Sequence, residues 1–92
     1  MMRNNGKVQG FELESLKNLG PVSSRQLQAV GIETIEQLET MGQVQAFQLV
    51  ANQFPSETSV TFLYALHGAL LDIPLGEMSD QDKARLRDQA RG

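Results

Sequence analysis

The strongest constraint on the fold is a pair of helix-breaking turns within residues 16–38, which read LKNLGPVSSRQLQAVGIETIEQL. Gly20 and Pro21 predict the first turn, because proline lacks a backbone donor and is tolerated in a helix only within its first turn. Ser23 or Ser24 is suited to cap the helix that follows. The chain therefore begins its fold with two short helices joined by a tight hairpin.

The second turn is at Gly31, which is placed to end the helix after the hairpin. Thr34 then opens another helix, since Gln37 three residues later has the spacing of a capping box. Beyond it, apolar residues continue to recur at helical spacing, and Pro55 ends one such segment. The pattern predicts six helices, at about residues 12–18, 23–30, 34–41, 42–54, 59–71 and 80–89.

The predicted helix at 59–71 is apolar on nearly all sides, which is typical of a helix in the middle of a bundle. No segment alternates between apolar and polar residues as a strand does. We therefore expect an all-α fold, a small bundle of five to six helices in which the N-terminal hairpin packs on this central apolar helix. Residues 1–10 are polar and without periodicity, so we expect a flexible tail before a single domain at 11–92.

Charge and composition exclude several classes of function. The 92 residues carry a net charge of -3, and no Lys or Arg lies between Gln26 and Asp82. That segment cannot supply the basic face of a non-specific nucleic-acid binder. The chain has no cysteine, which excludes disulfides and thiolate metal sites. No apolar run approaches the roughly 18 residues of a membrane span. We therefore expect a cytoplasmic protein with no membrane association.

Catalytic and metal-binding patterns are weak. His67 is the only histidine and lies on an apolar stripe, where a polar side chain at the edge of the core is the plainer interpretation. Glu33, Glu36 and Glu39 fall on successive turns of one helix, unlike the loop-borne carboxylates of a calcium site. Gly20, Gly31 and Gly42 lie at helix ends, where glycine is ordinarily a cap and not part of a phosphate-binding loop. We expect no enzyme activity, no cofactor and no metal.

The sequence of the hairpin resembles that of a phosphate-binding turn. In helix-hairpin-helix modules the turn presents backbone N–H groups at the start of the second helix, where they hold a DNA phosphate. Asn18 is suited to the left-handed conformation that such a turn requires, and Gly20 lets the backbone approach a ligand. Ser23, Ser24 and Arg25 add side chains for the same phosphate. These five residues are the predicted nucleic-acid contacts.

A protein partner is the alternative to duplex DNA. Val22 stands where a lysine would strengthen a phosphate site, and an acidic helix follows, so backbone contacts to DNA would be few and salt-sensitive. The uncharged, Gln-rich surface of residues 42–54 or the acidic helix at 34–41 would then face a regulatory protein. The C-terminal bases would assemble a basic patch with the hairpin only if they folded back beside it: Lys83, Arg85, Arg87 and Arg91.

A longer pattern resembles one known family. It combines a Leu-Gly-Pro turn, a Gly-Ile-x-Thr step and a Leu-x-Ala-Leu-x-Gly-Ala-Leu helix, at residues 19–21, 31–34 and 63–70. This set resembles the C-terminal domain of the TfoX/Sxy competence regulators, over about residues 13–86. The resemblance implies a small helical domain with a helix-hairpin-helix-like start, and a function in regulating natural transformation genes in bacteria. The Asn-Leu-Gly turn at 18–20 is also similar to the turn with which the C-terminal domain of the bacterial RNA polymerase α subunit meets DNA.

Overall fold

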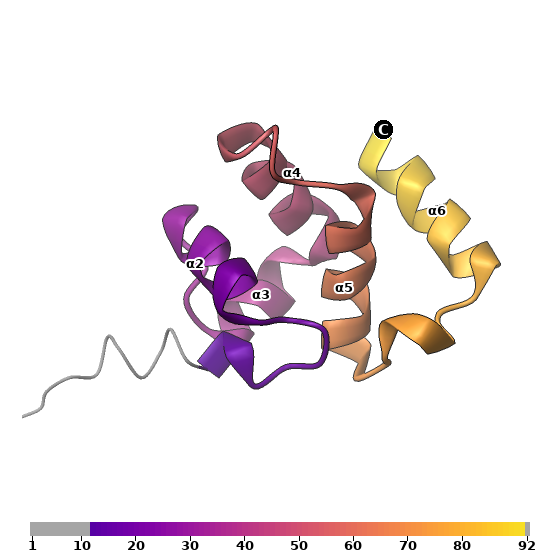
Figure 1. Cartoon of the computed structure of the whole chain (residues 1–92), viewed down its shortest axis with the longest axis horizontal. Coiled ribbons are helices and arrows are strands. Elements are labelled where there is room, and N and C mark those ends of the chain that lie inside the picture. The colour runs from indigo at the N-terminus through magenta and orange to yellow at the C-terminus, as the bar shows by residue number, and fades with distance from the viewer. Residues whose placement is uncertain (1–11, 92) are drawn as a thin grey trace, which may run out of the picture.

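The computed structural model describes residues 12–91 and contains no strand in that range. The chain forms a single helical turn at residues 12–14 and then a series of short helices (Figure 1). The predicted all-α bundle is confirmed, whereas the predicted tail at 1–10 lies outside the described residues. The elements are α2 (Pro21–Ala29), α3 (Ile35–Met41), α4 (Gln43–Gln53), α5 (Val60–Leu71), the 3₁₀ helix η1 (Leu75–Glu77) and α6 (Asp80–Arg91).

The first helix is shorter than predicted. Helical backbone ends at residue 14, not at residue 18, and the chain continues in turns that include a hydrogen bond of 3.3 Å from the Leu19 N–H to the Leu16 carbonyl. Asn18 has a φ of 71°, a left-handed conformation that a helix cannot continue. The prediction of a left-handed Asn18 is therefore confirmed, and turns connect the end of the helix at residue 14 to Asn18.

Helix α2 begins two residues before the predicted start. Gly20 is its N-cap and Pro21 is its first residue, where the fixed φ of proline suits a helix and its missing donor costs nothing. Ser23 and Ser24 lie inside the first turn, and no side chain caps the helix. The predicted serine cap is therefore wrong.

The C-terminal end of α2 and the start of α3 follow the predicted pattern. Gly31 has a φ of 91°, and the Ile32 N–H donates to the Leu27 carbonyl at 2.9 Å, as in a glycine-terminated helix. The Thr34 Oγ1 accepts from the Gln37 N–H at 3.0 Å, while the Gln37 Oε1 accepts from the Thr34 N–H at 3.1 Å. The capping box is therefore confirmed.

Two helices share the centre of the bundle. Helix α5 has the most buried residues, as predicted: Leu63 and Leu66 are fully buried, and Tyr64, Ala65, Gly68 and Ala69 are buried beside them. Helix α4, however, contacts more elements, packing against α2, α3, α5 and α6. Ala46 and Val50 of α4 are fully buried. Helix α2 packs mainly on α4, whereas the sequence predicts that it packs on α5.

Candidate functional site

The hairpin leaves the start of α2 open to solvent. The first intrahelical donor is Ser24, whose N–H donates to the Gly20 carbonyl at 2.9 Å. The N–H groups of Val22 and Ser23 precede it in the helix and therefore point out of its end. With no side chain capping Gly20, these two donors and the positive end of the helix dipole face outward together.

Asn18 holds this turn against the far end of α5. Its Nδ2 donates to the Ile73 carbonyl at 2.9 Å, and its Oδ1 accepts from the Leu75 N–H at 3.2 Å. Both partners lie in the connection that leaves α5. The Asn18 side chain is thus directed inward, and Asn18 positions the predicted phosphate-binding turn from within the protein.

The other predicted contact residues divide into two groups. Ser24 is 1% exposed, and Gln28 Nε2 lies 3.5 Å from its hydroxyl, so its side chain cannot reach an external phosphate. The prediction for the Ser24 side chain is therefore wrong, because the inner face of α2 passes through this position. Gly20 and Ser23 are half-buried at the open helix end, and Arg25 is exposed one turn further on.

Arg25 differs from the other bases of residues 12–91, each of which has an acidic or aromatic partner. Lys17 Nζ lies 3.4 Å from Asp72 Oδ1. On α6, two arginines form ion pairs with aspartates three residues before them, and the remaining two bases lie on Tyr64. These contacts are Arg85–Asp82 at 3.1 Å, Arg91–Asp88 at 3.5 Å, Arg87 Nη1 to Tyr64 Oη at 2.7 Å, and Lys83 Nζ at 5.6 Å from the Tyr64 ring centre.

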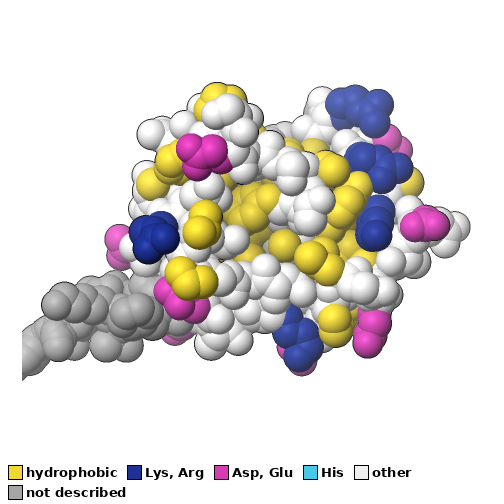
Figure 2. Space-filling model, in the orientation of Figure 1, with side chains coloured by type: hydrophobic (Ala, Val, Ile, Leu, Met, Phe, Trp, Pro, Cys, Tyr) yellow, Lys and Arg dark blue, Asp and Glu magenta, His cyan; other side chains and the backbone are white. Residues whose placement is uncertain are grey.

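The C-terminal bases do not join the hairpin. Helix α6 packs on α4 and α5, at the opposite side of the bundle from α2 (Figure 1). Figure 2 shows one face of the molecule, with dark blue basic side chains over α6 on one side, over α2 on the other, and a yellow apolar surface between them. The basic patch that would have combined both ends of the chain is therefore not formed.

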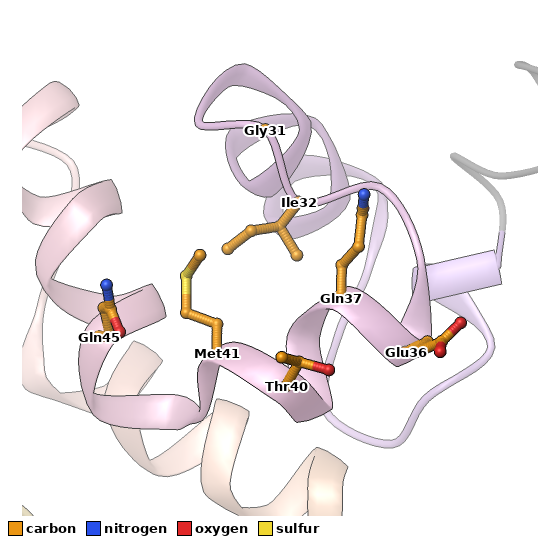
Figure 3. A pocket seen from close by; sticks show the side chains of 7 residues that line it. All are labelled: Gly31, Ile32, Glu36, Gln37, Thr40, Met41 and Gln45. Carbon is orange, nitrogen blue, oxygen red and sulfur yellow. The ribbon is translucent and has the colours of Figure 1, made fainter.

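A groove of about 560 Å³ lies at the other end of α2, between the turn after that helix, α3 and the start of α4. The side chains of Ile32 and Met41 point toward each other across it (Figure 3), and Met41 is half-buried. Polar side chains stand around this apolar floor. The lining residues are Gly31, Ile32, Glu36, Gln37, Thr40, Met41 and Gln45.

The groove exists because one residue joins α3 to α4. Gly42 ends α3 and caps α4, with a φ of 86° and a ψ of 159°, a backbone conformation that favours glycine. The two helices therefore diverge at once and leave a hollow between their outer faces. The sequence pattern named both helix surfaces as partner surfaces, but it contained no signal for the hollow, which depends on the angle between the helices.

The remaining candidates have no supporting arrangement among residues 12–91. His67 is half-buried, and its Nδ1 lies 3.4 Å from Gln43 Nε2. No group of three or more histidines or carboxylates in the described range is placed to hold a metal ion. Within the same range, no helix has both the length and the apolar character needed to cross a membrane.

Comparison with known proteins places these features in context. The sequence profile of the TfoX C-terminal domain matches residues 10–90. The crystal structure of an uncharacterised protein from Listeria monocytogenes is similar, with a TM-score of 0.78 and 29% sequence identity, over 86% of this chain and 89% of that one. No curated protein matches the chain in sequence.

Proposed function

We propose, since this chain belongs to the TfoX C-terminal domain family and is therefore a TfoX-like regulatory domain, that it contacts the phosphate backbone of duplex DNA at the start of α2. The backbone N–H groups of Val22 and Ser23 would donate to one phosphate, and the Arg25 guanidinium would pair with the same phosphate or its neighbour. Gly20 lets the backbone approach closely, and Asn18 positions the turn from inside.

The observation that carries this proposal is that Arg25, which has no ion-pair partner among residues 12–91, lies one turn from the uncapped start of α2. A base already held by a carboxylate must give up that contact to bind a phosphate, whereas Arg25 has no such partner among residues 12–91. The contact is expected to be weak and indifferent to base sequence, because backbone contacts position a protein without reading bases. Natural transformation genes, which the family resemblance implies, are the proposed setting.

Arg25→Glu is expected to abolish most binding to duplex DNA at low salt, because it replaces an attractive charge with a repulsive one. Arg25→Ala should reduce the slope of log K against log salt by about one, as expected for the loss of one phosphate contact. Fluorescence anisotropy with a labelled random-sequence duplex measures both. Arg85→Glu on α6 makes the same charge change, and it should weaken binding much less. Absence of binding by the unmodified chain at low salt would refute the proposal.

Gly20→Asp is expected to separate stability from binding. The φ of Gly20 is −126°, and a Cβ there meets no atom within 4 Å, so a larger residue fits. Aspartate is a preferred N-cap, and it should leave the unfolding midpoint unchanged or raise the free energy of unfolding by a few tenths of a kcal/mol. Its carboxylate would, however, occupy the position of the phosphate. Thermal unfolding and anisotropy on one sample should therefore show a stable domain that no longer binds DNA; retained binding would place the contact elsewhere.

A further inference from the structure

The groove at the other end of α2 has the shape of a docking site. Its volume of about 560 Å³ lies within the range of about 300–1,000 Å³ typical of ligand sites. The half-buried Met41 provides an apolar floor above Ile32, which is only 1% exposed, and the flexible thioether of methionine adapts to side chains of different shapes. Around the floor, the exposed Thr40 and Gln45 supply a hydroxyl and an amide that can bond to a peptide backbone (Figure 3).

The charged side chains around the groove are negative, and their carboxylates have no ion-pair partner among residues 12–91. Glu36 lines it, and Glu33 and Glu39 are exposed on the same segment. None of these three carboxylates forms an ion pair with a base of residues 12–91, and no Lys or Arg lies between Gln26 and Asp82. A phosphate backbone would be repelled here. A basic side chain would instead find acceptors that no other group neutralises.

We infer that this groove binds a short segment of another protein that presents one apolar side chain beside Lys or Arg. The apolar side chain would pack on Met41, and the basic group would pair with Glu36 at the edge. Such pairs at a rim contribute modestly to affinity and more to the choice of partner. The burial of the apolar side chain therefore provides the affinity.

This site is separate from the proposed DNA contact. Helix α2 has nine residues, so its two ends are roughly 14 Å apart at 1.5 Å per residue. The open N–H groups lie at the start of the helix, and the groove lies beyond its end. The two contacts use different residues, so failure of either proposal leaves the other intact.

A peptide library displayed on phage tests the inference without assuming a partner sequence. Selection on the immobilised full chain is expected to enrich peptides that carry an apolar residue within one turn of Lys or Arg. In titrations of a synthetic peptide from that selection, the amide resonances of residues 31–45 should shift. Lack of enrichment, or shifts that map to another surface, would overturn the inference.

Charge reversal provides the matched test. Glu36→Lys is expected to weaken the selected peptide about tenfold, because it replaces a rim ion pair with a repulsion. Glu77→Lys, on the exposed η1, makes the same charge change and should have little effect. A peptide with Glu in place of its basic residue should bind the Glu36→Lys variant better than the unmodified chain, a gain that an unfolded variant cannot show. If Glu36→Lys and Glu77→Lys lost affinity for the peptide equally, the peptide would be attracted only by the overall negative charge of the protein, and the site would be refuted. If sedimentation shows that the chain forms dimers and that Glu36→Lys disrupts them, the inference is overturned, because the groove then binds a second copy of this chain.

Discussion

Gly68→Ala is expected to lower the free energy of unfolding by about 3 kcal/mol, although alanine is the better helix former by about 1 kcal/mol. A Cβ at this position in α5 would collide with the Ile73 carbonyl oxygen and would lie 2.5 Å from Asn18 Nδ2. Both are fixed, because they are hydrogen-bonded to each other at 2.9 Å. The chain leaving α5 would have to lift away from the helix to make room.

Chemical and thermal unfolding measure this effect. For a domain of this size the transition temperature should fall by roughly 15 °C, since each kcal/mol shifts it by about 4–8 °C. Gly76→Ala is the matched control, because a Cβ there meets no atom within 4 Å, and its effect should stay within about 0.5 kcal/mol. If Gly68→Ala proved neutral or stabilising, the close crossing of Ile73 over α5 would be incorrect.

Asn18→Ala is expected to lower the free energy of unfolding by about 3 kcal/mol through two separable effects. Alanine is strained at a φ of 71°, at about 1–2 kcal/mol for a residue in this conformation. The substitution also leaves the Ile73 carbonyl and the Leu75 N–H without the amide that now pairs with them, and each loss costs about 1 kcal/mol or more. Urea unfolding of Asn18→Gly should recover the first effect and retain the second.

Asp72 is a useful control for Asn18, because its φ is also positive, at 60°. Its carboxylate makes only a surface ion pair with Lys17, so Asp72→Gly should change stability by less than about 1 kcal/mol. Gly68→Ala and Asn18→Gly should also be less than additive in combination, because the amide of Asn18 is one of the atoms that the new methyl meets. Strict additivity would show that the two positions are independent.

The two interactions explain how the proposed DNA site keeps its shape. The hairpin has little regular structure between residues 15 and 20, where the chain forms turns between the first helix and α2. Asn18 fixes it to the segment after α5, and Gly68 lets that segment pass close enough to be reached. A loss at either residue is therefore expected to impair the presentation of the Val22 and Ser23 N–H groups through the fold, without any contact to DNA.

Several helix boundaries were predictable because they depend on local chemistry. The Thr34–Gln37 capping box, the glycine end at Gly31 and the stop before Pro55 each involve residues within a few positions of one another. The start of α2 was missed although it is also local. Proline and serine both favour a helix start, and in this chain Pro21 occupies the first position while both serines lie within the first turn.

The candidate site was predicted only in part for a related reason. Sequence identified the turn, its left-handed Asn18 and Arg25, but it gave no role to the Asn18 side chain and assigned the Ser24 side chain to a phosphate. Their actual direction depends on contacts with residues such as Ile73, which lies 55 positions away from Asn18 in the chain. The groove and the separation of α6 from α2 likewise depend on how helices distant in sequence are packed.

By itself, the sequence determined that the chain is helical, where most helices end, which family it resembles and that no broad basic face is present. These properties follow from residue type and spacing over short distances, where capping, proline and periodicity act. The tertiary structure alone decided that α4 shares the centre with α5, that Asn18 binds inward and that a groove opens beside Gly42. Helix packing angles and contacts across tens of residues set these features, and no local preference encodes them.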